Sequence, residues 1–167
     1  MRRMILGAGL ALLMAAPAWA QSLSADVSLA RDSRQVTTVN VEDLKAIVVA
    51  SGYKVDAVGT MGAVSVRGKT PDGLVFMLIG NACEGSVCYG VNMQIRYDSD
   101  SDVTLQKINT AAVRYAAVAL WWDQGEATWG LSRYVVLDEG VTMGNVKANL
   151  AVLMAANPKV VEVIWPN

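Results

Sequence analysis

The stretch RYAAVALWWDQGEATWGLSRYVVLD, residues 114–138, decides the fold of this chain. Two long arms rich in Val, Leu, Trp and Tyr flank a short turn at residues 124–126. Alternating β-branched and aromatic residues are typical of strands, and a Gly in a short polar break is typical of a hairpin turn. The stretch therefore predicts a long antiparallel hairpin. So much apolar surface requires a sheet with at least one covered face.

Strand geometry separates the tryptophans of this hairpin. Trp121 and Trp122 are neighbours in sequence, so they must point to opposite faces of the sheet. One indole can be core, and the other needs a helix, a partner or a ligand to cover it. Helices on both faces would cover both indoles. If one stays uncovered, a candidate binding surface is formed by Trp121, Trp122, Trp129, Met93 and Tyr134, because aromatic residues are enriched at contact surfaces.

The segments on either side of the hairpin have the spacing of helices. The helix before it has its inner face at Leu105, Ile108 and Ala112. The helix after it is capped by Thr142 and has apolar positions at Met143, Val146, Leu150 and Leu153. Asn157 followed by Pro158 predicts a cap and the first position of a separate short helix near the end of the chain.

The N-terminal half predicts one helix and four strands. Asn40 is a typical N-cap with Asp43 three residues later, as in a capping box, and Gly52 is a typical stop for a helix over residues 41–51. Turns rich in Gly, Pro and Asp separate the apolar runs that follow. These runs predict strands over residues 53–58, 63–68, 74–81 and 89–98.

Two cysteines, Cys83 and Cys88, bracket a four-residue loop between the last two of these strands. A disulfide there would hold the register of the hairpin at its tip, and chain-entropy arithmetic gives it about 2 kcal/mol of stabilisation. The alternative is a redox dithiol, but the spacing is not that of a CxxC motif. A structural disulfide between Cys83 and Cys88 is the favoured interpretation.

The first 20 residues have the pattern of an export signal. Arg2 and Arg3 precede a short apolar run, and the AWA sequence that ends at Ala20 is a small-x-small cleavage site. The apolar run is shorter than a membrane span, which needs about 20 residues. Cleavage after Ala20 would give a periplasmic or secreted protein, by the general secretory route in preference to twin-arginine export.

The chain after the predicted cleavage site divides into a lead-in and one domain. Residues 21–38 are polar and mixed, which predicts a flexible lead-in with a short edge strand around residues 35–39. The rest of the chain, residues 39–167, contains no linker or repeat and suits a single domain with its own core. No apolar run in it reaches membrane-spanning length, so we expect no membrane span after cleavage.

Composition argues against several classes of function. The chain has 14 basic and 15 acidic residues, and two of the basic ones leave with the leader, so we expect no basic face for nucleic acid. There is no histidine, which removes the commonest metal ligand and the commonest general base. Two cysteines without histidine also make a poor metal site. We therefore expect no metal, no cofactor and no nucleic-acid partner.

Catalytic residues are equally hard to find. The carboxylates available for acid–base chemistry lie in hairpin turns and are typical of solvated caps: Asp123, Glu126, Asp138 and Glu139. The acidic segment 98–102 resembles the start of a calcium loop, but Val103 and Asn109 occupy the places that need Gly and Glu. Serines near glycine have no histidine to activate them. We expect that the protein is not an enzyme.

The order of these features resembles the YbjN family. The likeness is carried by VEDL at residues 41–44, Gly52-Tyr53, the hairpin from Cys83 to Cys88, Asn109 before Arg114-Tyr115, Trp122-Asp123 with Gly125, and Gly140-Val141-Thr142. It covers about residues 39–165. Tyr115 stands where the family usually has Phe, and the turn after Asp123 is less acidic than the family's, which leaves the fold intact and blurs any family-specific surface.

The resemblance implies an α+β fold like that of type III secretion chaperones. In that fold an antiparallel sheet of about five strands carries helices packed on it, in the order α-β-β-β-β-α-β-β-α. The family is described as sensory transduction regulators and offers no catalytic residues to carry over. Because type III secretion chaperones commonly form dimers, the resemblance leaves both a monomer and a homodimer open.

Two functions are compatible with these observations. The first is an exported regulator or chaperone-like module that binds another protein or peptide. The alternative is a carrier of a small apolar ligand, with a pocket between sheet and helices lined by Met77, Met93, Met154 and the Trp cluster.

Overall fold

The computed structural model describes residues 29–166, so the predicted leader and the first part of the lead-in lie outside the described residues. The elements follow in the order β1 (Gln35–Val36), α2 (Val41–Ala50), β2 (Lys54–Val58), β3 (Ser65–Lys69), β4 (Val75–Glu84), β5 (Val87–Asp98), α3 (Leu105–Arg114), β6 (Ala119–Asp123), β7 (Thr128–Val136), β8 (Val141–Thr142) and α4 (Met143–Ile164).

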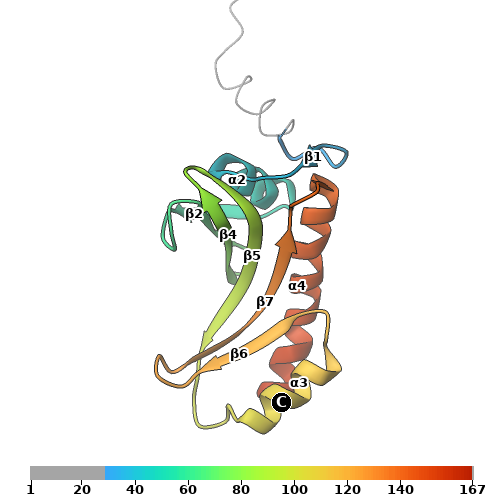
Figure 1. Ribbon diagram of the computed structural model, residues 1–167. Helices are drawn as coiled ribbons and strands as arrows, with labels where there is room; N and C mark the ends of the chain where they lie inside the picture. The colour runs from blue at the N-terminus through green and yellow to red at the C-terminus, as the bar shows by residue number, and fades with distance from the viewer. Residues whose placement is uncertain (1–28, 167) are drawn as a thin grey trace, which may run out of the picture.

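One antiparallel sheet forms the centre of the structure. Its six strands lie in the order β2-β3-β4-β5-β7-β6, and each strand pairs antiparallel with its neighbours. Helices α2, α3 and α4 pack against one side of this sheet (Figure 1). The α+β class and the predicted order of helices and long strands are confirmed. The sheet has six strands where about five were predicted, and β1 and β8 form a separate two-stranded sheet.

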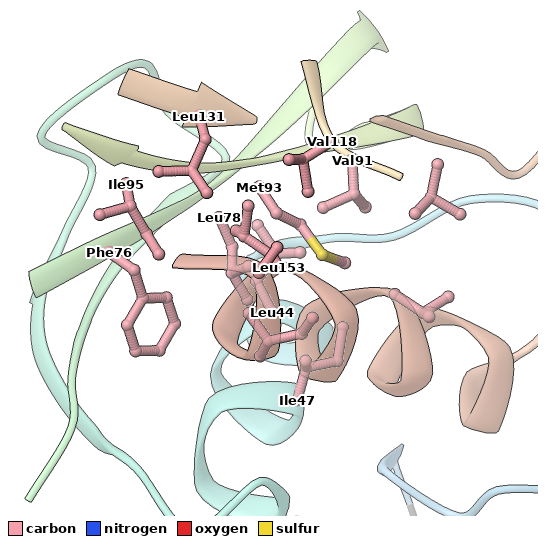
Figure 2. Packing of buried hydrophobic residues seen from close by; sticks show 14 of the residues in the cluster. Leu44, Ile47, Phe76, Leu78, Val91, Met93, Ile95, Val118, Leu131 and Leu153 are labelled. Atoms are coloured by element: carbon pink, nitrogen blue, oxygen red, sulfur yellow. The ribbon is translucent and has the colours of Figure 1, made fainter. Parts of the chain in front are cut away.

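The core lies between the helices and the sheet face that they cover. Strand residues at every second position reach it, which is the expected consequence of the period-two geometry of a strand. Figure 2 shows how side chains of α2, β4, β5, β7 and α4 meet there, among them Leu44, Ile47, Phe76, Leu78, Met93, Ile95, Leu131 and Leu153, all of which are buried.

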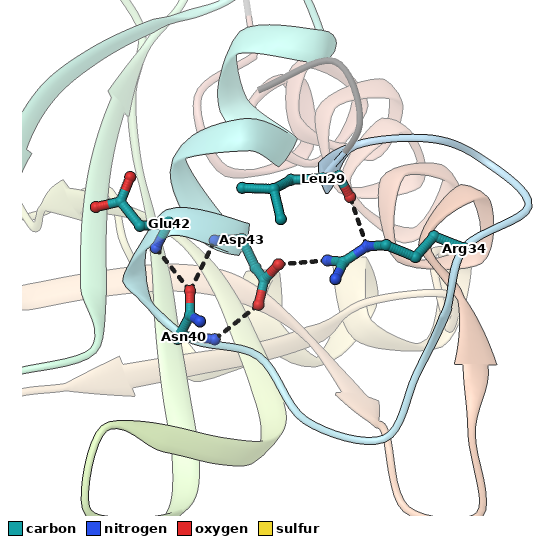
Figure 3. Close-up of polar contacts among 5 residues, drawn as sticks. All are labelled: Leu29, Arg34, Asn40, Glu42 and Asp43. Atoms are coloured by element: carbon teal, nitrogen blue, oxygen red, sulfur yellow. Dashed lines mark hydrogen bonds and ion pairs between the residues drawn. The ribbon is translucent and has the colours of Figure 1, made fainter. Parts of the chain in front are cut away.

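The predicted capping box at the start of α2 is present. The Asn40 Oδ1 accepts hydrogen bonds from the backbone N–H of Glu42 and Asp43, and Asp43 Oδ2 accepts one from the Asn40 N–H at 3.0 Å. The other oxygen of Asp43 pairs with Arg34, whose Nε also donates to the Leu29 carbonyl at 2.7 Å (Figure 3). One carboxylate therefore ties the end of the lead-in to the first helix.

The described part of the predicted lead-in packs against the domain. Ala30 and Val36 are buried, and β1 pairs with β8 immediately before α4. The amide N–H of Val39 donates to the Cys88 carbonyl at 2.9 Å, and the Cys88 N–H donates back at 2.8 Å. Residues 29–38 are therefore held by the domain, because their apolar side chains find partners that lie far away in sequence.

The first arm of the predicted hairpin is shorter than expected. Residues from Arg114 onward were predicted as strand, but α3 continues to Arg114 and β6 begins only at Ala119. The Tyr115 N–H donates to the Ala111 carbonyl at 2.8 Å, which closes the last turn of the helix. Residues 115–118 then form a turn, in which the Val118 N–H donates to the Tyr115 carbonyl at 3.1 Å, so they cannot belong to the strand.

The predicted separate last helix is also corrected. Helix α4 runs without interruption over 22 residues and contains Pro158 in its interior. Asn157 does not cap a helix. Its side chain is buried and accepts a hydrogen bond from the Tyr97 hydroxyl at 2.8 Å. Val160 and Ile164 beyond the proline are fully buried, and this packing outweighs the cost of proline in a helix.

The predicted disulfide is confirmed. Cys83 and Cys88 are directly opposite each other on β4 and β5, with Cα atoms 3.9 Å apart, and their sulfurs are bonded. Cys88 is fully buried, and its backbone is the one that pairs with Val39. The disulfide therefore fixes both the tip of the hairpin and the place where the lead-in crosses it.

Replacing both cysteines, as in Cys83→Ala with Cys88→Ala, is expected to lower the free energy of unfolding by about 2 kcal/mol, because the unfolded chain regains the entropy of a six-residue loop. Urea unfolding followed by circular dichroism measures this loss. A reductant should lower the urea midpoint of the wild-type protein and leave the midpoint of the double variant unchanged. A wild-type midpoint that is the same with and without reductant would contradict the prediction.

The Tyr97→Phe substitution is expected to cost about 1–3 kcal/mol at neutral pH, because it leaves the buried Asn157 oxygen without a donor. Burial raises the pKa of Tyr97, against a smaller lowering by its bond to Asn157. Neutral Tyr97 therefore contributes its full stability below the ordinary tyrosine pKa, and this contribution is lost as pH rises through the raised value.

Urea midpoints measured at neutral and at alkaline pH test both parts of this prediction. The wild-type protein should lose more stability than Tyr97→Phe on the way to alkaline pH. Tyr134→Phe, at a half-exposed tyrosine for which no such bond exists among the described residues, is the matched control and should behave as wild type at neutral pH.

Candidate binding face of the sheet

The structure divides the predicted binding surface between the two faces of the sheet. Met93 and Trp129 have an exposed fraction of 0%, so neither is available to a partner, and this part of the prediction is wrong. Both residues point to the face on which the helices pack. Tyr134 lies on the opposite face and is 50% exposed. The five residues therefore do not form one surface.

Trp129 is the centre of an aromatic cluster inside the core. Its ring stacks on Tyr97 with centroids 4.8 Å apart, and the edge of Trp165 from the end of α4 meets it at 5.2 Å. The Trp165 indole N–H donates to both carboxylate oxygens of Asp100 at 3.1 Å and thereby lowers the pKa of Asp100. The cluster closes the core where α4 ends.

Trp122 is the indole that the chain itself covers. It stands directly opposite Trp129 in the pairing of β6 with β7, so it shares the helix-covered face. Its side chain is half-buried against the core, and its Nε1 donates to the Ser99 hydroxyl at 3.3 Å. Trp122 therefore has both apolar packing and a hydrogen-bond partner within the described chain.

Trp121 points to the opposite, uncovered face. It is paired with Gly130 of β7, and a Cβ atom built on Gly130 would lie 2.5 Å from Cζ2 of the indole. The absence of a side chain at Gly130 thus lets the ring lie over the strand. On its outer side, the guanidinium of Arg96 lies 5.3 Å from the ring centroid, a distance typical of a cation–π contact. Trp121 is half-buried.

We call the uncovered side of the sheet the open face. Tyr134 lies there over Gly90, again at a position where a Cβ atom would collide with the ring, and Val136 beside it is 58% exposed. The register places residues of β3, β4, β5 and β6 on the same side as these residues of β7. The open face consists of Arg67, Met77, Ile79, Asn92, Gln94, Arg96, Trp121, Ser132, Tyr134 and Val136.

The open face combines apolar and polar side chains. Its aromatic and aliphatic members are separated by the amides of Asn92 and Gln94, which can donate and accept hydrogen bonds. Arg67 is paired with Asp56 of β2 at 2.5 Å, whereas Arg96 rests on Trp121. Such a mixture suits contact with another polypeptide, which presents both apolar side chains and backbone polar groups.

The carboxylates that we considered for chemistry are exposed. Asp123 Oδ1 accepts from the backbone N–H of Gly125 and Glu126 at 3.0 and 3.1 Å, so it holds the hairpin turn in place. Asp138 and Glu139 are likewise exposed in the turn after β7. Within residues 29–166, no three His, Cys, Asp or Glu side chains are placed together to hold a metal ion. In the same range, no helix is long and apolar enough to cross a membrane.

The pocket considered for a small apolar ligand is not formed. Met77 lies on the open face, Met93 is inside the core, and Met154 is half-buried on α4. Hollows that the structure describes are open grooves on the outer surface, such as one of about 390 Å³ lined by Asp32, Ser51, Tyr53, Lys147 and Ala151. The three methionines cannot therefore line one cavity.

Sequence reasoning missed the glycines and the arginine that place the open-face aromatics. Gly90, Gly130 and Arg96 carry no signal on their own, because their roles depend on which residue lies across from each in the neighbouring strand. Alternation within the strand predicted over residues 89–98 places Asn92, Gln94 and Arg96 on one face. The register with β7 was the missing information.

Comparison with known proteins supports the fold. No family model matches this sequence, and no curated protein matches it either. An uncharacterised protein from Methanothermobacter thermautotrophicus has a similar structure, with a TM-score of 0.52 and 10% identity over 75% of this chain and 96% of that one. A chain of the HopA1–SchA chaperone–effector complex is similar with a TM-score of 0.51 and 12% identity, over 71% of this chain and 93% of that one. At these identities the likeness concerns the fold alone.

Proposed function

We propose that this protein is an exported, non-enzymatic, YbjN-like module that binds another polypeptide on the open face of its sheet, as a sensory transduction regulator or a chaperone. The observation that carries the proposal is the one-sided packing of the sheet. Helices cover one face, and the other face leaves Tyr134 and Val136 exposed and Trp121 half-buried.

The shape of the open face favours a polypeptide over a small molecule. Small ligands are usually held in concave pockets that bury most of their surface. The open face is the surface of a sheet, and its apolar residues are spread over β4, β6 and β7. An extended or partly folded chain can contact residues spaced in this way, with Tyr134 and Trp121 as aromatic anchors.

The fold likeness supports the same class of function. One of the two similar structures is a complex between a chaperone and an effector, so this architecture is compatible with protein binding. Export is supported by the leader pattern in residues 1–20 and by the disulfide, because disulfides persist in oxidising compartments. The lack of histidine and the exposure of the turn carboxylates support a role without catalysis.

A defined unfolded chain tests the proposal directly. Reduced, carboxymethylated lactalbumin stays unfolded without denaturant, and its binding to the purified protein can be followed by fluorescence anisotropy. We expect Tyr134→Ala and Trp121→Ala each to weaken binding about tenfold, because each removes an aromatic anchor worth 1–2 kcal/mol.

Val49→Ala is the matched control, because Val49 is a similarly exposed apolar residue on α2, away from the sheet. It should bind the unfolded chain as the wild type does. Circular dichroism and urea midpoints must show that all three variants are folded. Equal binding by the wild type and both open-face variants, or no binding by any of them, would refute the proposed function.

A further inference from the structure

We propose that the polypeptide bound on the open face carries an acidic segment, which contacts Lys54 and Lys69 at the β2–β3 edge of the sheet. The inference names the kind of partner and therefore rests on the proposed function. It is carried by the position of the two lysines beside the open face, by the carboxylates around them, which are engaged elsewhere, and by the distribution of charge across the sheet.

The register of three strands places both lysines on the same side of the sheet as the open face. Lys54 of β2 lies directly opposite Lys69 of β3, and Lys69 lies opposite Val75 of β4. Residues opposite each other in an antiparallel pair point to the same side, and Val75 is two residues from Met77 of the open face. Both lysines and Val75 are exposed. We call Lys54 and Lys69 the lysine edge.

The lysine edge holds two like charges without an opposite charge beside them. Like charges directly opposite each other in a sheet are destabilising. Among residues 29–166, neither lysine forms an ion pair. Asp56 of β2 pairs with Arg67, and Asp72 in the turn after β3 accepts a hydrogen bond from the Thr70 hydroxyl. Carboxylates of a bound chain can therefore supply the charge that the sheet itself does not place there.

Protection of the sheet edge explains only one of the two lysines. Charged residues, lysine above all, are common on edge strands, where they block pairing with another chain. Lys54 is on the edge strand β2, but Lys69 is on β3, which is paired on both sides. A hollow of about 390 Å³ beside them is lined by Gly52, Lys54, Lys69, Thr70 and Pro71. This hollow has room for a carboxylate side chain next to the two lysines.

The opposite edge of the same side of the sheet is acidic. Asp98 of β5 and Asp123 of β6 are exposed, and both are in register with Thr128 of β7. Strand alternation places them on the side of Arg96 and Trp121, each two residues further along its strand. An acidic segment would be repelled at that edge and attracted to the lysine edge. The bound chain therefore has one favourable placement on the open face.

The width of the sheet sets the spacing of contact residues in the partner. Lys69 and Trp121 lie on β3 and β6, which are four strand spacings apart in the order β3-β4-β5-β7-β6. Neighbouring strands are about 4.8 Å apart, so the separation is roughly 19 Å, which an extended chain covers in about six residues. The partner therefore needs apolar residues about six positions from its acidic segment to reach Trp121 and the lysine edge together.

Two fluorescent peptides test the inference on the processed protein, secreted with its own leader and purified. Each has a run of Leu and Phe and a spacer of about six Gly and Ser residues, followed by glutamates in one peptide and by glutamines in the other. Fluorescence anisotropy at low salt should show that the wild type binds the glutamate peptide about fivefold more tightly, because exposed ion pairs form with the two lysines. High salt should remove the difference, because it screens exposed charges.

The double variant Lys54→Gln with Lys69→Gln should bind the two peptides equally, as tightly as the wild type binds the glutamine peptide. Lys159→Gln is the matched control, because Lys159 is an exposed lysine on α4, on the helix side of the sheet, and it should keep the preference for glutamate. Since all three lysines are exposed, both variants should keep the urea midpoint of the wild type.

Equal binding of the two peptides by the wild type, a preference for glutamate that survives in the double variant, or a preference lost in Lys159→Gln would each overturn the inference. So would a single-stranded oligonucleotide of the same charge that binds as tightly as the glutamate peptide. If both peptides bind equally and Tyr134→Ala weakens both, the proposed function stands and only the inference fails. If neither the peptides nor unfolded lactalbumin bind, both fail.

Discussion

The packing of helices on a single face of the sheet is the constraint on which the rest of this structure depends. Every second residue of β4, β5 and β7 enters the core beneath α2 and α4, and the residues between them are left on the open face. Since a strand alternates strictly, a shift by one residue would exchange the two sets of side chains. The bond between Cys83 and Cys88 holds β4 and β5 in the register that keeps the core side chains on one face and the open-face side chains on the other.

This one-sided arrangement explains how neighbouring residues come to have different roles. Trp122 lies opposite Trp129 on the face that the helices cover, whereas Trp121 lies over Gly130 and under Arg96 on the open face.

Local signals in the sequence predicted well the elements that depend on short-range interactions. The capping box of Asn40 and Asp43, the Thr142 cap and the cysteine hairpin all involve groups a few residues apart. Prediction failed where distant residues decide the outcome. Asn157 and Pro158 look like a helix start, but a bond to Tyr97 and the burial of Val160 keep α4 continuous. Met93 and Trp129 look like contact residues until the helices are placed over them.

The sequence by itself determined the class of fold, the disulfide, and the main helices and strands. It also determined that the two adjacent tryptophans point to opposite faces of the sheet, because all of these follow from periodicity and local bonding. Only the tertiary structure decided which face of the sheet the helices cover, which tryptophan lies on the open face, and that β6 lies at an edge of the sheet. Those outcomes depend on strand order and register, which arise from contacts between segments far apart in the chain and leave no local pattern.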